Sequence, residues 1–195
     1  MIISLGGSCA VSHQIRKQKN NYTLPFDWTR ISLKQLTLTL QNNFKNYSNV
    51  IIHKYSENHK SYILKNYYNV QFSHEVKKKY TISEFNKKLN NRIKKFNKIL
   101  EDTNDEINFV RFETSPYYAN YFSDFIELLN IIHIIKNKNC NINIKLILHK
   151  SYLNKLDFCN NKIKINLYNI KIYYYDDFNI NWKYPNIKWT EILKL

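Results

Sequence analysis

The hydrophobic pattern at the start of the chain predicts a strand, a tight turn and a helix. Residues 2–5 form a short apolar run that ends at two glycines. Val11 and Ile15 follow four residues apart, on one face of a helix expected from residue 8 or 9 to about residue 17. A strand, a glycine turn and a helix in this order are the usual opening of an α/β unit.

Helical spacing returns twice before the middle of the chain. Ser32 is a suitable N-cap for a helix that runs to about Phe44, and Ser83 is a suitable N-cap for a longer helix. The longer helix is amphipathic, with one apolar face (Phe85, Leu89, Ile93, Phe96 and Leu100) and one basic face (Lys87, Lys88, Lys94 and Lys95). Between the two helices, runs rich in aromatic and branched residues predict short strands near residues 51–52, 62–64 and 68–72.

Strand and helix patterns alternate in the second half of the chain. We expect a strand at residues 107–112, a helix at 121–136, a strand at 142–148, one or two strands within 163–175 and a short helix near 189–193. Runs that are apolar on both faces are typical of parallel strands covered by helices. The sequence therefore predicts one α/β domain over residues 1–195, a Rossmann-like three-layer fold with a mainly parallel sheet flanked by helices.

Composition narrows the class of protein. Apolar residues make up 44% of the 195 residues, which excludes a disordered chain, and no apolar run is long enough to cross a membrane. The apolar start lacks the basic region of a signal peptide. Three cysteines without a C-x-x-C pair favour free thiols and a reducing, cytoplasmic location. The sequence offers no metal-ligand spacing and no nucleotide-binding glycine motif, so we expect no metal and no organic cofactor.

The net charge of +15, from 30 basic and 15 acidic residues, raises the question of a nucleic-acid partner. Abundant Asn, Ile, Lys and Tyr, whose codons are AT-rich, indicate that genome composition explains part of this charge. A basic nucleic-acid-binding module without catalysis, using the lysine face of the helix after Ser83, is therefore an alternative function. Its binding would weaken steeply with added salt.

The glycine turn is the sharpest candidate for chemistry. Both glycines of the chain, Gly6 and Gly7, stand here, followed by Ser8, Cys9 and Ala10 at the start of a helix. Backbone N–H groups at a helix N-terminus favour a thiolate and can bind an oxyanion, so we expect a lowered pKa for Cys9 and an oxyanion site around Gly7 to Ala10. The simpler interpretation is an ordinary tight turn with a small buried cysteine.

A thiol nucleophile needs a base, and the spacing leaves three histidines open. His13 lies one helical turn after Cys9, His149 ends a predicted strand, and His74 ends a strand-like run and precedes Glu75. The other three fit non-catalytic positions: one in an apolar run of the core (His133) and two beside a polar loop (His53 and His59).

The segments ISLGGSC (residues 3–9), IRK (15–17) and LPFDW (24–28) resemble the SLG-x-x-C, LR and PFDW motifs of a family of papain-like cysteine peptidases found in bacteria and large DNA viruses. Weaker matches are FSHE (72–75) to F-x-HD and NFVRF (108–112) to FVR. The resemblance implies a thiol hydrolase acting on peptide or protein substrates, with Cys9 as nucleophile, His74 as base, and Asp27 orienting the imidazole or shaping the site.

The chain departs from the family pattern in two places. Glu75 replaces the usual Asp of the HD pair, and Ala10 rather than an aromatic residue follows Cys9. Asp27 also has a structural alternative, in which it caps the next helix or holds Trp28. A different α/β hydrolase or a transferase that uses the same strand-end cleft is the remaining alternative function.

Overall fold

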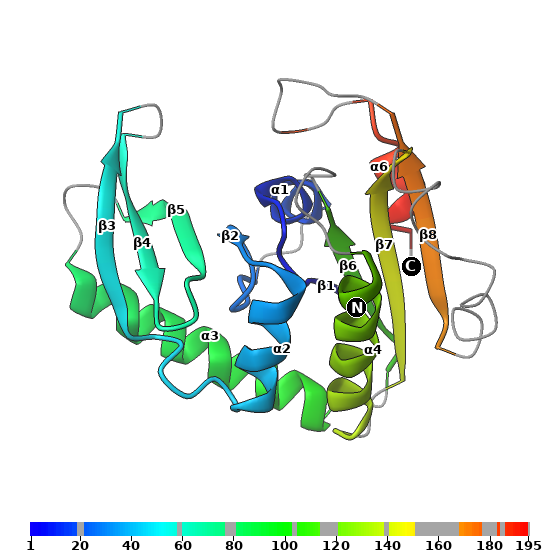
Figure 1. Cartoon of the computed structure of the whole chain (residues 1–195), viewed down its shortest axis with the longest axis horizontal. Coiled ribbons are helices and arrows are strands. Elements are labelled where there is room, and N and C mark those ends of the chain that lie inside the picture. The colour runs from blue at the N-terminus through cyan, green and yellow to red at the C-terminus, as the bar shows by residue number, and fades with distance from the viewer. Residues whose placement is uncertain are drawn as a thin grey trace.

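The computed structural model describes residues 1–18, 22–57, 60–76, 81–102, 105–113, 121–138, 141–150, 168–176, 183 and 186–194, with only the backbone described at His74 and at residues 121–124. It contains two four-stranded sheets (Figure 1). The parallel sheet has the order β1 (Ile2–Ser4), β6 (Ile107–Phe112), β7 (Ile142–His149) and β8 (Ile170–Tyr175). The antiparallel sheet has the order β2 (Thr29–Arg30), β5 (Gln71–Val76), β4 (Ser61–Asn66) and β3 (Val50–Ser56).

Helices cover both faces of the parallel sheet, which confirms the predicted α/β class. Side chains alternate along each strand, so Ile2 and Val110 join one apolar cluster while Ile3 and Phe109 join another. The first cluster is closed by α1 (Cys9–Lys17) and α6 (Trp189–Ile192). The second is closed by α2 (Leu33–Gln41), α3 (Ile82–Asp102) and α4 (Tyr121–Lys136).

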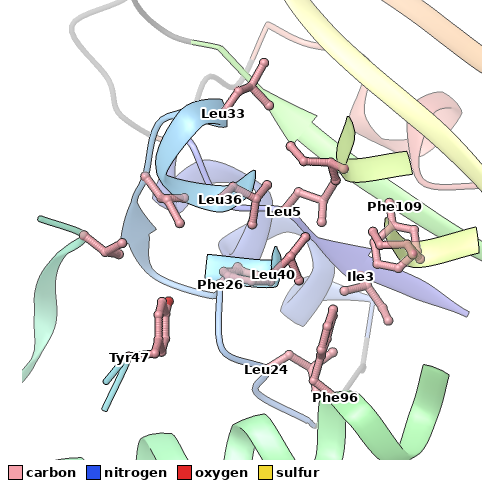
Figure 2. Packing of buried hydrophobic residues seen from close by; sticks show 14 of the residues in the cluster. Ile3, Leu5, Leu24, Phe26, Leu33, Leu36, Leu40, Tyr47, Phe96 and Phe109 are labelled. Atoms are coloured by element: carbon pink, nitrogen blue, oxygen red, sulfur yellow. The ribbon is translucent and has the colours of Figure 1, made fainter. Parts of the chain in front are cut away.

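The second cluster continues from the parallel sheet to the antiparallel one. Phe26 lies at its centre, with its ring 5.5 Å from the rings of Phe44 and Phe96 and 5.9 Å from that of Tyr47 (Figure 2). Tyr47 in turn contacts the ring of Phe72 on β5. Aromatic rings thus link the loop after α1 to helix α3 and to the antiparallel sheet, and the same apolar cluster continues to the parallel sheet.

Several predicted boundaries shift. The cap of α3 is Thr81 rather than Ser83, because Thr81 Oγ1 accepts from Glu84 N while the Glu84 carboxylate accepts from Thr81 N. Helix α2 is capped by Ser32 as predicted but ends at Gln41. The predicted strand at 68–72 is replaced by β5, which begins at Gln71. Part of the predicted 163–175 region, Cys140, Cys159 and His59 lie outside the described residues.

His133 is a correction, because it is exposed on α4 instead of lying in the core. The buried face of α4 has the spacing of Leu128, Ile131, Ile132 and Ile135, and residue 133 falls on the other side of the helix. Within the described part of the chain, no helix is both long and apolar enough to cross a membrane.

Candidate functional site

Three segments that are far apart in the sequence meet at the glycine turn between β1 and α1. Gly6 and Gly7 have φ values of +73° and +87°, a region that favours glycine. A Cβ on Gly6 would lie 2.4 Å from Ile31 Cγ2, and a Cβ on Gly7 would lie 2.4 Å from the backbone oxygen of Phe112. The turn therefore requires glycine for its backbone conformation and for the close approach of its neighbours.

Arg111 supports the same turn from β6. Its side chain is 1% exposed, and its Nη1 donates to the backbone oxygen of Leu5 at 3.0 Å. Its Nε donates to Glu113 Oε1 at 2.6 Å, and the two side chains form an ion pair. The sequence signal for this role was a charged residue within a strand that is otherwise apolar apart from Asn108.

Cys9 is the first residue of α1 and is half-buried. Ser8 caps the helix, with its Oγ accepting from Ala10 N at 3.2 Å. The Ala10 amide is therefore already bonded. The amide of Cys9 lies beside its own sulfur and lowers the pKa of the thiol. Of the two amides, the Cys9 amide is thus the one that acts on the sulfur.

The expected low pKa of Cys9 is wrong. Burial raises the pKa of the thiol and outweighs the lowering by Arg30 and by the Cys9 amide. With a smaller rise from the charge of Glu75, the pKa is about 11. The helix N-terminus favours the thiolate as expected. The loss of water around the sulfur has the larger effect on the pKa and favours the neutral thiol. The thiol is therefore neutral at pH 7 in the unliganded protein.

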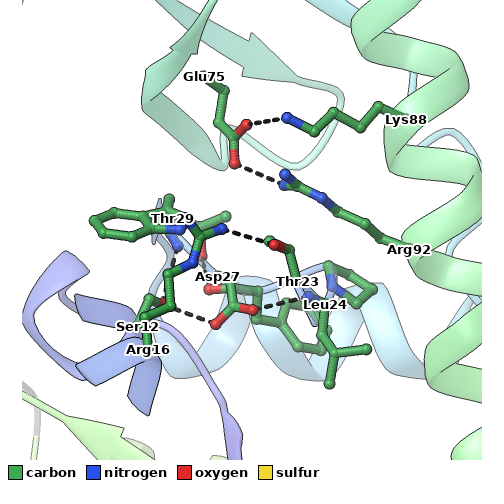
Figure 3. Close-up of polar contacts among 12 residues, drawn as sticks. Ser12, Arg16, Thr23, Leu24, Asp27, Thr29, Glu75, Lys88 and Arg92 are labelled. Atoms are coloured by element: carbon green, nitrogen blue, oxygen red, sulfur yellow. Dashed lines mark hydrogen bonds and ion pairs between the residues drawn. The ribbon is translucent and has the colours of Figure 1, made fainter. Parts of the chain in front are cut away.

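Asp27 connects the PFDW loop to helix α1 (Figure 3). Its Oδ1 accepts from Ser12 Oγ and its Oδ2 from Leu24 N, both at 2.8 Å. Ser12 Oγ also accepts from Trp28 N at 3.1 Å, and Trp28 has a φ of +60°, unusual for a bulky residue. Burial raises the pKa of Asp27, opposed by the hydrogen bonds from Leu24 and Ser12.

These contacts match the alternative in which Asp27 holds Trp28. They do not match a helix cap, because Ser32 caps α2.

β5, which carries His74 and Glu75, has a β-bulge. Leu64 pairs with Phe72 and Tyr62 with Val76, so three residues of β5 stand opposite one residue of β4. A bulge interrupts the alternation of side chains and is a common way to direct a side chain into a site. The other edge of β5 pairs with β2, directly after the PFDW loop.

Glu75 forms a buried ionic cluster with helix α3 (Figure 3). Its carboxylate lies 2.8 Å from Arg92 Nη1 and 2.9 Å from Lys88 Nζ. Burial disfavours the carboxylate, but Arg92 and then Lys88 outweigh burial and lower the pKa of Glu75 below its ordinary value. Sequence reasoning missed Arg92, which occurs on a helix face otherwise occupied by apolar residues.

A pocket of about 230 Å³ lies at this cluster and is lined by Arg16, Trp28, Glu75 and Lys88. The Arg16 guanidinium lies over the Trp28 ring, 5.0 Å from its centre. Glu75 both lines this pocket and acts on the charge of Cys9. Glu75 therefore links β5 to the pocket by position and to the thiol by charge.

The remaining histidines lie in different surroundings. His13 on α1 is half-buried, and its pKa is lowered by burial, Lys17 and Lys183. His149 ends β7 as predicted and is buried against the ring of Tyr175. His53 is exposed as expected. The charges of Arg30 on β2 and of Glu75 on β5 both act on the Cys9 thiol.

The basic face of α3 is present, with Lys87, Lys94 and Lys95 exposed. Lys88 is ion-paired with Glu75. Among the residues that the structure describes, no three His, Cys, Asp or Glu side chains are grouped as a metal site would require.

Comparison with known proteins gives one match. The family described as "Putative papain-like cysteine peptidase (DUF1796)" matches residues 1–152. This range contains the glycine turn, the PFDW loop, β5 and β6. No curated protein and no solved structure matches the chain.

Proposed function

Since the chain belongs to this family of papain-like cysteine peptidases, we propose that it is a thiol hydrolase of peptide or isopeptide bonds. Cys9 is the nucleophile and His74 is the general base. The observation that carries the proposal is the effect of the Glu75 charge on the pKa of Cys9, because Glu75 stands next to His74 on the bulge of β5. The packing of the glycine turn supports the same assignment, because a Cβ on Gly6 would lie 2.8 Å from Thr29 Oγ1, and Thr29 pairs with Phe72 on β5, the strand of His74.

The high pKa of Cys9 defines what the base must do. A thiol that is neutral at pH 7 attacks a carbonyl only if its proton is removed as the C–S bond forms. His74 accepts that proton, the carbonyl oxygen takes the negative charge, and the Cys9 amide donates to it. His74 then returns the proton to the leaving amine, and water hydrolyses the thioester to a carboxylic acid and the free thiol.

The neighbouring residues support these steps indirectly. The Glu75 carboxylate next to His74 favours the protonated imidazole that forms during attack. Asp27 holds Trp28 and the PFDW loop against α1, so it is a positioning residue. Trp28 and Arg16 then form one wall of a pocket in which a substrate side chain can bind.

Thiol labelling followed by peptide mapping tests this function. We expect iodoacetamide to label Cys9 slowly at pH 7.5, with a rate that rises roughly tenfold per pH unit as the thiolate fraction grows, up to a midpoint at about 11. A peptidyl vinyl sulfone, which resembles a substrate, is expected to label Cys9 at pH 7.5 in preference to Cys140 and Cys159.

His74→Ala separates the base from the thiol. The variant is expected to lose about 100-fold in vinyl sulfone labelling at pH 7.5, because a positioned base contributes roughly that factor. Iodoacetamide labelling at a pH above 11 should be unchanged, because the thiolate forms there without a base. His13→Ala is the matched control and should label as the unmodified protein does. Equal vinyl sulfone rates in the His74→Ala and unmodified proteins would contradict the assignment of the base.

A further inference from the structure

One face of the parallel sheet carries a regular set of polar side chains, at the end opposite to Cys9. Asn108, Asn143 and Asn169 stand in register on β6, on β7 and just before β8. In the next row, Lys145 is in register with Val110 on one side and Lys171 on the other. Faces of a parallel sheet are normally apolar and covered by helices, so polar rows on three neighbouring strands are unusual.

These rows line a second pocket, of about 450 Å³. The apolar cluster closed by α1 and α6 uses the other half of the same face, through Phe112, Ile147 and Tyr175. The pocket lies roughly 13 Å along β6 from the glycine turn, since Asn108 precedes Phe112 by four residues at about 3.3 Å each. It is therefore separate from the Cys9 region.

Lys145 is the residue that indicates a ligand. It is 9% exposed, and its Nζ donates to the backbone oxygen of Lys194 at 2.6 Å. Among the described residues, no carboxylate lies within ion-pair distance of it. The charge of Glu106 raises the pKa of Lys145, but its carboxylate accepts from Asn108 Nδ2 at 2.8 Å. Lysines that are buried to this extent are usually paired with an anion, because an ammonium group that leaves water without a counter-charge is destabilised.

The neighbouring charges strengthen this point. Burial and the like charge of Lys171 both lower the pKa of Lys145. A bound anion would reverse both effects, since it would replace lost hydration and separate the two ammonium groups. The two lysines and the three asparagines thus provide charged and neutral hydrogen-bond donors on one wall of the pocket.

We propose that this pocket binds a phosphate group, held by Lys145 and Lys171, with the asparagine amides contacting the rest of the molecule. Lysine is a common phosphate ligand that acts as a point charge, and two lysines match the double charge of a phosphate monoester better than a single carboxylate. A pocket of about 450 Å³ accommodates a ligand as large as a nucleotide.

Titration by NMR with ¹⁵N-labelled full-length protein tests the proposal, using inorganic phosphate, adenosine 5′-monophosphate and a short oligothymidylate as probes. We expect saturable shifts at Asn108, Asn143 and Lys171 with at least one probe. Lys145→Met, which keeps the length of the side chain, should weaken binding at least tenfold, because hydrogen bonds to charged groups contribute about that factor. Lys171→Met should weaken it as well, and its exposed position protects the fold if Lys145→Met fails to fold.

Lys94→Met is the matched control, because it removes the same charge from the exposed face of α3 and should bind as the unmodified protein does. If the mononucleotide binds saturably and the oligonucleotide binds no more tightly, the phosphate belongs to a small molecule. Tighter oligonucleotide binding with a steep salt dependence assigns it to a nucleic-acid backbone. Absence of saturation with all three probes, or equal binding by the Lys145, Lys171 and Lys94 variants, would overturn the proposal.

Discussion

Replacing Gly7 by alanine is expected to lower the free energy of unfolding by about 2 to 5 kcal/mol. About 1 to 2 kcal/mol comes from a non-glycine residue in the left-handed region, where Gly7 has a φ of +87°. The rest comes from overpacking, since the new Cβ would lie 2.4 Å from the Phe112 backbone oxygen and 3.0 Å from Arg111 Cζ. Urea unfolding followed by circular dichroism measures the difference.

Ser8→Ala is the matched control, one residue further along the same turn. It removes the cap that accepts from Ala10 N, so we expect a loss of only about 1 kcal/mol. The two variants thus separate the cost of replacing a required glycine from the smaller cost of losing a helix cap. A Gly7→Ala protein as stable as the Ser8→Ala protein would contradict the close contact between the turn and β6.

The buried pair of Glu75 and Arg92 supports the second large effect. Glu75→Gln keeps the shape of the side chain but leaves the Arg92 guanidinium, which is 5% exposed, without its counter-charge. We expect a loss of about 3 to 5 kcal/mol in the free energy of unfolding, the usual cost of removing one partner of a buried ion pair. Urea unfolding at pH 7 measures it.

Two further variants isolate the pair. Lys88→Met removes the other partner of Glu75. Because the Lys88 side chain is 55% exposed, this loss should cost at most about 1 kcal/mol in the free energy of unfolding. Glu75→Gln combined with Arg92→Met should recover part of the loss, because no uncompensated charge then remains buried. Additive losses in the double variant would show that Arg92 and Glu75 act independently.

The pH dependence of stability follows from the same pair. The pKa of Glu75 is lower in the folded protein than its ordinary value of 4.5, so its contribution to stability is complete above that value. It is lost as the pH falls through the lower pKa of the folded state. Unfolding midpoints measured from pH 6 to pH 2 should therefore fall more steeply for the unmodified protein than for Glu75→Gln.

The same substitution should also act on Cys9. The negative charge of Glu75 raises the pKa of the thiol, and its removal leaves Arg92 uncompensated nearby. The midpoint of iodoacetamide labelling at Cys9 in Glu75→Gln should consequently lie below the value of about 11 in the unmodified protein. An unchanged midpoint would contradict the effect of the Glu75 charge on Cys9, on which the proposed function depends.

Local pattern was enough to locate most of the elements of the parallel sheet. The strand at 107–112 and the helix at 121–136 have the predicted bounds, because a continuous apolar run and a helical period are properties of adjacent residues. The need for glycine at residues 6 and 7 was also visible, since a chain that contains only two glycines places both in one turn.

Local pattern predicted the antiparallel sheet less well. Its strands were expected only as short extended runs, and the bulge at His74 and Glu75 arises from pairing with β4 rather than from any property of these two residues. The exposure of His133 likewise depends on which side of α4 meets the core.

Local sequence pattern predicted the order of the elements, the glycine turn and the candidate thiol residue, because backbone preference and side-chain type are properties of neighbouring residues. Tertiary structure alone decided the ionisation of Cys9, the partners of Asp27 and the pairing of Glu75 with Arg92. Burial and long-range charge contacts depend on which distant segments enclose a group, and in this protein burial outweighs the helix start that favoured a thiolate.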